Sequence, residues 1–305
     1  MRVTRIAAVL TALTALTCTP ADRSALVAPS GPQFAHVPDL EGTPDLIVDA
    51  KRLADSWVVY EQELKESFCS ISEGGTSPGF HRVLRFTVTT PNIGDADIAI
   101  GDPAKHIDPN GDGDFSDSDG LYELSTCHRH WHFRNYAKYE LIQAGTGRVI
   151  RARKHGFCMI DVTPWNSGDG GVASWVYRVC GRPARGDLPA VVGNQGISVG
   201  YADTYFKWLG GQYFVLDEDP AGPVPPGDYT LRITVNPPFV CGVGDEQRPR
   251  DSNGMCHMFV ESNYDNNVGE AQITIPDHPG KKGFGPGGGQ DPVDEIVDDE
   301  NRPDK

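Results

Sequence analysis

Positive charge is scarce in this chain. It has 27 Lys and Arg residues against 42 Asp and Glu residues, which gives a formal net charge of -15 at pH 7. This deficit argues against nucleic acid as a partner, because a phosphate backbone needs a basic surface to bind. It favours cationic ligands instead, such as primary amines or calcium ions.

Long apolar runs and helical repeats are also rare. Beyond the first 18 residues, no segment of the 305 is long and apolar enough to span a membrane as a helix. Glycine (35 residues) and proline (24 residues) are abundant, while alternating strand-like runs occur at residues 57–60, 81–88 and 229–235. We therefore expect an all-β, antiparallel, sandwich-like single domain with long loops.

The amino terminus has the pattern of an export signal. Arg2 and Arg5 precede an apolar run at residues 6–17 that is too short to cross a membrane stably. We expect a signal segment at residues 1–18, and a secreted protein or a cell-surface lipoprotein. Cys18 stands where a lipoprotein carries its lipid, so membrane attachment through Cys18 and simple cleavage nearby both stay open.

Composition divides the rest of the chain into three parts. Residues 19–40 are small, polar and proline-containing, which is typical of a linker. Residues 41–278 form the expected folded domain, and residues 279–305 are glycine-rich and then acidic, which predicts a disordered tail. The domain holds six cysteines, an even number that indicates disulfides in an exported protein, with 15 pairings open. They are Cys69, Cys127, Cys158, Cys180, Cys241 and Cys256.

Three histidines at alternate positions are the sharpest chemical signal. His128, His130 and His132 would share one face of an extended segment, because strand side chains alternate with a period of two. Arg129, Trp131 and Phe133 would then take the other face. Imidazole is a preferred ligand of copper, zinc, iron and nickel, and copper binds most tightly among the divalent ions. We predict a metal site here.

Other interpretations of the histidines have lower weight. A chance cluster is improbable when three of nine histidines fall within five residues. A structural zinc site would need a fourth ligand nearby, and Cys127, which could serve, is needed for a disulfide in the pairing given below.

An acidic stretch at residues 108–119 has the spacing of a calcium loop. Oxygen-bearing side chains fall at loop positions 1, 3, 5, 9 and 12, with Gly113 at position 6 for the sharp turn. The last position is an aspartate where the common motif has a bidentate glutamate. The alternative is a flexible acidic turn. The predicted ligands are Asp108, Asn110, Asp112, Asp114 (through its carbonyl) and Asp119.

Short motifs in a fixed order over residues 44–276 resemble the catalytic domain of the lysyl oxidase family. Two further features, the lipoprotein-like cysteine and the extra calcium loop, are more typical of a bacterial exported member than of an animal one. The motifs are Pro44-Asp45-Leu46, His81-Arg82-Val83-Leu84-Arg85-Phe86, Cys127-His128-x-His130-x-His132, Lys154-x-x-Phe157-Cys158, Gly196-x-Ser198-x-Gly200 with Asp203-Thr204-Tyr205, Pro226-Gly227-x-Tyr229 with Val235-Asn236-Pro237, and Glu261-Ser262-x-Tyr264-x-Asn266-Asn267.

The resemblance implies a copper amine oxidase with a self-made quinone. The three histidines match the copper ligands of the family. Lys154 and Tyr205 match the pair that copper and oxygen join into lysyl tyrosylquinone, whose carbonyl captures a primary amine. The general base is not placed by any motif, although Asp203 lies close to Tyr205 in the sequence.

The resemblance also implies bridges and a structural calcium ion. The family pairing suggests Cys69–Cys127 and Cys158–Cys180, and Cys241–Cys256 would close a loop that resembles an insertion. Animal members have two further bridges, at positions matching Gly75 with Gly211 and Pro164 with Tyr201, and all four cysteines are absent here. The family calcium ligands map to Asp45, Leu46 (through its carbonyl), Glu261, Asn263, Asn266 and Asn267.

The predicted function is an exported copper amine oxidase that deaminates primary amines or peptidyl lysine with molecular oxygen. Aldehyde, ammonia and hydrogen peroxide are the expected products. The alternative is a non-catalytic, calcium-stabilised, metal-binding surface protein with the same fold. A zinc- or iron-dependent enzyme that uses the three histidines as a facial ligand set is the third possibility.

Overall fold

The computed structural model describes residues 42–73, 75–154, 156–165 and 176–292, which belong to one compact unit. The predicted signal segment, the linker, Cys18 and residues 293–305 of the predicted tail lie outside the described residues. Within them, no helix is long and apolar enough to cross a membrane.

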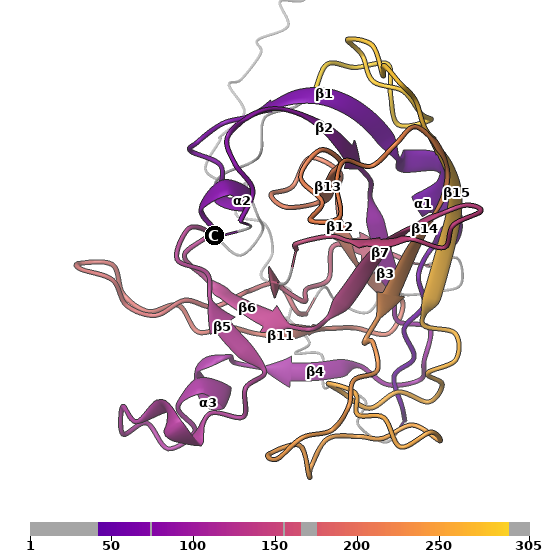
Figure 1. Ribbon diagram of the computed structural model, residues 1–305. Coiled ribbons are helices and arrows are strands. Elements are labelled where there is room, and N and C mark those ends of the chain that lie inside the picture. Colours follow the sequence, from indigo (N-terminus) through magenta and orange to yellow (C-terminus); the bar gives the residue numbers. More distant parts are fainter. Residues whose placement is uncertain (1–41, 74, 155, 166–175, 293–305) are drawn as a thin grey trace, which may run out of the picture. The chain divides into compact units, whose positions relative to one another are not determined.

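The largest sheet contains four antiparallel strands in the order β15-β14-β7-β8 (Figure 1). Buried and exposed residues alternate along all of β15, as the period of two requires when one face of a strand is covered. β14 pairs with β15 and with β7 over most of its length. The buried face of this sheet forms part of the main hydrophobic core. The strands are β7 (Ala137–Gln143), β8 (Val149–Arg151), β14 (Gly227–Val235) and β15 (Val268–Ile275).

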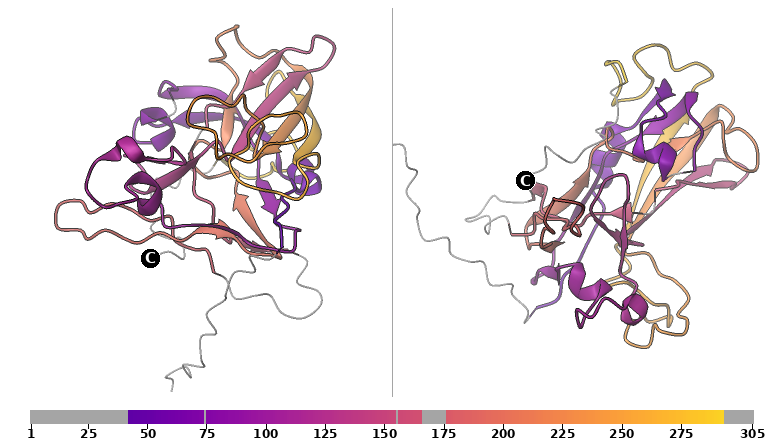
Figure 2. Two further views of the ribbon diagram at one scale, coloured as in Figure 1. Left: turned by 90° about the horizontal axis from the view of Figure 1, so that it is seen from below. Right: turned by 90° about the vertical axis from the view of Figure 1, so that its left-hand side faces the viewer.

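Four smaller antiparallel sheets complete the β structure that the sequence predicts, and the fold class is confirmed. Three of them have three strands each and one has two, and Figure 2 shows the ribbon from two further sides. The sheets are β1 (Val58–Leu64), β2 (Gly79–Arg85) and β13 (Tyr213–Val215); β3 (Val88–Pro91), β12 (Tyr201–Tyr205) and β10 (Thr163–Pro164); β5 (Tyr122–Leu124), β6 (Trp131–Arg134) and β9 (Gly156–Phe157); and β4 (Ile98–Gly101) with β11 (Gln195–Ile197).

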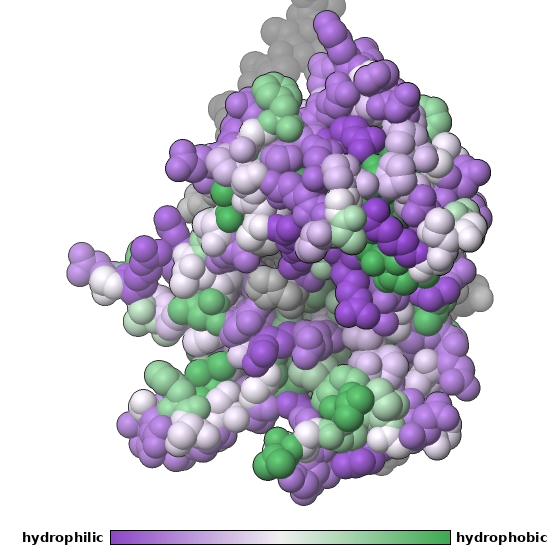
Figure 3. All heavy atoms as spheres, in the orientation of Figure 1, coloured by the Kyte–Doolittle hydropathy of each residue, from purple (hydrophilic) through white to green (hydrophobic). Residues whose placement is uncertain are grey.

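Helices are few and short among the described residues. Asp49 caps α1 (Ala50–Ser56) by accepting a hydrogen bond from the Arg52 N–H at 2.9 Å. The others are α2 (Cys69–Ser72), α3 (Ala104–Ile107) and a 3-10 turn, Phe115–Asp117. The face in Figure 3 is mainly hydrophilic with separate apolar groups, which suits an acidic protein surrounded by water.

Three disulfides join segments that are distant in the chain. They are Cys69–Cys127 and Cys158–Cys180, which the family resemblance suggests, and Cys241–Cys256, which closes the expected inserted loop. Pro164 and Tyr201 are direct partners in the β10–β12 register, so one of the bridges absent here would also connect adjacent positions.

Residues 280–289 differ from the expectation of a disordered tail. Phe284 forms a two-way backbone bridge with Val59 of β1, with N···O distances of 2.8 and 2.9 Å. Its ring also lies 6.1 Å from that of Trp57. The glycines allow the chain to approach this closely, since a Cβ on Gly285 would lie 2.6 Å from the Trp57 ring. A glycine-rich composition therefore signals close backbone contact here.

Candidate metal centre

The three histidines of the sequence motif converge in space. Their ligand nitrogens all lie within 4.8 Å of one another, and no other such group of His, Cys, Asp or Glu occurs among the described residues. His132 Nε2 lies 3.1 Å from His130 Nε2 and 3.3 Å from His128 Nδ1. His130 and His132 are buried. This arrangement fits one metal ion bound by three imidazoles.

The three histidines do not converge from one extended segment, although the sequence predicted one. Only His132 of the three lies in strand β6, whereas His128 is in a turn and Arg129 has a left-handed φ of 62°. The turn is closed by the Arg129 N–H donating to Ser125 O at 2.8 Å and the Ser125 N–H donating to His130 O at 3.0 Å. The prediction of one shared strand face is therefore wrong, because the chain reverses to pair β6 with β5.

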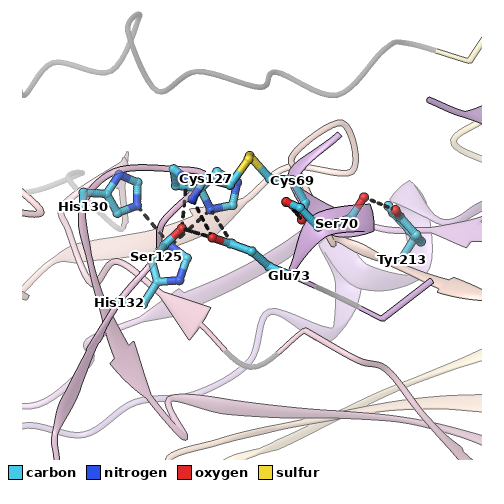
Figure 4. Close-up of a disulfide and its surroundings, with 10 residues drawn as sticks. Cys69, Ser70, Glu73, Ser125, Cys127, His130, His132 and Tyr213 are labelled. Carbon is cyan, nitrogen blue, oxygen red and sulfur yellow. Dashed lines mark hydrogen bonds and ion pairs between the residues drawn. A yellow bond between two sulfur atoms is a disulfide. The ribbon is translucent and has the colours of Figure 1, made fainter. Parts of the chain in front are cut away.

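Glu73 is a functional neighbour that sequence reasoning missed. Its carboxylate lies 3.7 Å from His128 Nδ1 and accepts hydrogen bonds from the segment before it (Figure 4). No motif could have indicated Glu73, because it lies 55 residues before His128 and comes near it only through the Cys69–Cys127 bridge.

Lys154 and Tyr205 meet beside the histidines. The Lys154 Nζ lies 5.1 Å from the centroid of the Tyr205 ring and 4.9 Å from that of Phe157. The Tyr205 side chain is 2% exposed, and its hydroxyl donates to Cys158 O at 2.8 Å. Phe157 packs edge-on against Tyr205, with ring centroids 5.2 Å apart.

One cavity contains all five of these chemical groups. Its lining includes the three histidines, Lys154 and Tyr205. Tyr205 lies in β12, about 70 residues after the histidine segment in the sequence. The remaining lining is Gly156, Phe157, Cys158, Leu209 and Gly210.

The model of the family described as lysyl oxidase matches residues 44–278 of this sequence. The chain belongs to the lysyl oxidase family. The matched range begins with the Pro44-Asp45-Leu46 motif and ends just after β15, so it covers every strand described above.

Curated relatives from animals agree with this assignment. The chain is 24% identical to human lysyl oxidase homolog 2 over 255 residues, which is 78% of this chain and 25% of that protein. It is also 24% identical to pig protein-lysine 6-oxidase over 243 residues, or 78% of each chain. For the rat protein-lysine 6-oxidase the identity is 24% over 249 residues, 78% of this chain and 47% of that protein. The chain thus spans about a quarter of the length of the lysyl oxidase homolog 2 proteins it matches.

A second cavity, of about 80 Å³, adjoins the candidate metal centre of this lysyl oxidase family member. It shares His128, His132 and Lys154 with the smaller cavity, so it offers a path from the surface to the site. Glu73, Glu218 and Asp219 also line it, together with Arg151 and Arg153. Asp219 is paired with Arg148 and Glu218 with Arg153, so the charges along this cavity are mixed.

Buried oxygen atoms gather where the family resemblance places calcium. Glu261 accepts from the Leu46 N–H at 2.6 Å, and the Asn266 amide donates to Asp45 at 3.0 Å. Burial, assisted by the charge of Asp45, raises the pKa of Glu261 to about 7. The Oδ1 atoms of Asn266 and Asn267 are buried without a hydrogen-bond partner. Oxygen acceptors that the protein leaves unsatisfied fit a hard cation such as calcium.

The predicted second calcium loop is less complete. Asp108 accepts from the backbone N–H groups of Gly111 and Gly113 at 2.8 and 3.0 Å. Asp119, at the last loop position, instead contacts His106 Nδ1 at 2.6 Å, and this hydrogen bond raises the pKa of His106. Calcium binding by this loop stays a prediction.

Asp203 lies on the same face of β12 as Tyr205. It is 1% exposed, and its charge adds to burial in raising the pKa of Tyr136 and of Tyr139. The position is close to the aromatic groups around Tyr205, and a role of Asp203 as general base stays a prediction.

Proposed function

We propose that this lysyl oxidase family member is an exported copper amine oxidase of the protein-lysine 6-oxidase type. It would oxidise primary amines or peptidyl lysine through lysyl tyrosylquinone made from Lys154 and Tyr205. The observation that carries the proposal is the single cavity lined by three histidines, a lysine and a tyrosine. The names of the protein-lysine 6-oxidase relatives support it.

Copper is the metal that the ligand set and the chemistry favour. His128, His130 and His132 would hold it through neutral imidazole nitrogens, and three protein ligands leave positions open for oxygen. Bound copper supplies the one-electron couple that oxidation of the tyrosine ring requires. The burial of His130 and His132 limits the access of water to the ion.

The surroundings of Lys154 and Tyr205 prepare them to be joined. The Tyr205 ring would gain one oxygen atom from molecular oxygen, and Lys154 Nζ would bond to another ring carbon with loss of its hydrogen, the electrons passing to oxygen. An uncharged amine is the required nucleophile, and the Lys154 Nζ already lies over the rings of Phe157 and Tyr205. The Cys158 carbonyl holds the Tyr205 hydroxyl and so fixes the plane of the ring.

The completed quinone supplies an electrophilic carbonyl and accepts two electrons from the substrate. Overall, one amine, one oxygen molecule and one water molecule give one aldehyde, one ammonia and one hydrogen peroxide.

Export is part of the proposal. The amino-terminal pattern of residues 1–18 and three disulfides both suit an oxidising compartment outside the cytosol. Attachment to a membrane through a lipid on Cys18 is one form that this export could take.

The decisive experiment is mass spectrometry of the protein reconstituted with copper in air. We expect colour, a phenylhydrazine adduct, and a crosslinked peptide pair that joins Lys154 to Tyr205. Lys154→Ala and Tyr205→Phe should abolish all three signals and peroxide release, a loss of at least about a thousandfold in turnover.

Matched controls separate the chemistry from the fold. Tyr201→Phe alters another buried tyrosine of β12, and Lys105→Ala alters an exposed lysine, so both should keep the crosslink. Bound metal without colour, crosslink or peroxide in the unaltered protein would contradict the proposal and favour a non-catalytic metal-binding surface protein. Bound zinc or iron with turnover but no crosslink would favour a different enzyme.

A further inference from the structure

We propose that Glu73 is a positioning residue of the metal centre. Its carboxylate holds the turn that carries His128 and places a negative charge beside the cation that the three histidines would bind. The proposal rests on the metal site of the proposed function, but it concerns a residue that no motif of the family resemblance includes.

The carboxylate of Glu73 connects directly to the turn. The Ser125 hydroxyl donates to this carboxylate and lies 2.8 and 3.0 Å from its two oxygens. The Cys127 N–H donates to it at 2.7 Å. The Ser125 oxygen in turn accepts from the His128 N–H at 2.9 Å. Figure 4 shows Glu73 reaching from the helix of Cys69 towards Ser125 and Cys127. The backbone on both sides of Cys127 is therefore fixed by one side chain.

The turn needs such support because its backbone is strained. Arg129, between two of the histidines, has a φ of 62°, a left-handed conformation that is unfavourable for a residue with a side chain. Two connections oppose relaxation of the turn, the Cys69–Cys127 bridge and the Glu73 carboxylate. Both start from α2, whose last turn is closed by the Glu73 N–H donating to Cys69 O at 2.8 Å.

The charge of Glu73 also faces the ligand nitrogen. Its Oε2 lies 3.7 Å from His128 Nδ1, the same atom that lies 3.3 Å from His132 Nε2. The side chains of Glu73 and His128 are only 20% and 16% exposed, so water screens this interaction little. A negative charge beside the ligand nitrogen favours a bound cation, while the hydrogen bonds of the same carboxylate to the turn position the imidazole. Glu73 would therefore act through its charge and through the turn that carries His128.

The test is metal affinity of the full-length, metal-free protein, measured by competition titration with Cu(II) and with Zn(II). Glu73→Gln keeps the shape of the side chain and removes the charge, and should weaken binding by about 10–100-fold. Glu66→Gln is the matched control, because Glu66 is an exposed glutamate of the same segment, and its affinity should stay within about twofold of the unaltered protein. Equal affinity in Glu73→Gln and Glu66→Gln would overturn the proposal.

Two further measurements exclude a merely structural effect. The Cu(II) electron paramagnetic resonance spectrum of Glu73→Gln should show altered hyperfine splitting, whereas thermal unfolding of the metal-free protein and the Cys69–Cys127 bridge should be unchanged. An unaltered spectrum would count against a role at His128. If Glu73→Gln does not fold, Ser125→Ala tests the hydrogen-bond half of the proposal. That variant keeps the carboxylate, so a several-fold weaker affinity is expected and an unchanged one refutes it.

These measurements need neither the quinone nor amine turnover. A protein that binds copper, loses affinity in Glu73→Gln and releases no peroxide would refute the proposed oxidase and support the role of Glu73. A protein that oxidises amines normally, and whose metal affinity is unchanged in Glu73→Gln, would support the proposed oxidase and refute the role of Glu73.

Discussion

At the scale of single residues, the metal centre depends on the absence of a side chain at Gly156. This glycine begins β9 and lies directly against the ring of His132. A Cβ at position 156 would overlap the His132 Nδ1 and lie 2.7 Å from its Cγ, a separation that packed carbon atoms do not adopt. Gly156 thus sets the ring position of the one metal-binding histidine that belongs to a strand.

Gly156→Ala should displace the His132 ring and weaken metal binding. We expect a loss of at least about tenfold in affinity for Cu(II), comparable to the loss of a residue that orients a ligand. Competition titration of the metal-free protein measures it. Gly242→Ala is the control, because a Cβ there meets only the Asp245 carboxylate at an ordinary 3.5 Å. Unchanged affinity in Gly156→Ala would show that the His132 ring can move without cost.

At the scale of elements, the buried carboxylate of Asp161 connects its own segment to two other segments of the chain. Asp161 accepts four hydrogen bonds, from the N–H groups of Val176, Tyr177 and Ser198 and from the Ser198 hydroxyl, at 2.7 to 3.2 Å. It is 1% exposed, and burial raises its pKa despite these bonds. The segment after Cys158, which holds the Tyr205 hydroxyl, is anchored in this way.

Asp161 should make stability depend on pH. The pKa of Asp161 is higher in the folded state than in the unfolded chain. Its contribution to the free energy of unfolding is therefore full below the unfolded-state pKa of about 3.9 and is lost as pH rises through the folded-state pKa. Asp161→Asn removes this dependence but leaves buried donors unpaired, which costs about 1–3 kcal/mol at any pH. The unfolding free energy of the unaltered protein should therefore exceed that of Asp161→Asn by an amount that narrows as pH rises.

Chemical denaturation across a pH series measures this difference. Asp187→Asn, at an exposed aspartate, should show the same change of unfolding free energy with pH as the unaltered protein. A gap that widens with rising pH would mean that the hydrogen bonds dominate and that the pKa of Asp161 is lowered.

At the scale of the whole molecule, the start of the folded domain is tied to its last strand through the candidate calcium site. The Leu46 N–H and Glu261 are separated by 215 residues and are hydrogen-bonded at 2.6 Å. Val48 packs closely against Gly269 of β15. A cation that joins Asp45 to the unpaired oxygens of Asn266 and Asn267 would reinforce the same connection.

Removal of calcium should therefore destabilise the whole domain. At a hundredfold excess over the dissociation constant, calcium would add about 2.7 kcal/mol to the unfolding free energy. Thermal unfolding with calcium and with a chelator measures the shift. Asn266→Ala should abolish most of it, whereas Asp108→Asn, in the separate acidic loop, should keep it. An equal calcium shift in Asn266→Ala would place the stabilising ion elsewhere.

The sequence by itself determined the class of the fold and the residues of the candidate site. The histidines could be predicted from their alternate spacing, whereas the lysine and the tyrosine could be predicted only from the order of motifs that identified the family. Strands such as β14 and β15 could be predicted because alternation along the chain directly reflects one buried face.

Only the tertiary structure decided how these groups meet. The turn at His128, the contact of Glu73 and the close approach of Gly156 to His132 depend on residues that are remote in the sequence. The same holds for the bridge between Phe284 and β1, where composition alone suggested disorder. Local patterns report the preferences of a segment, whereas a backbone reversal held by a disulfide and a distant carboxylate is determined by the packing of the whole domain.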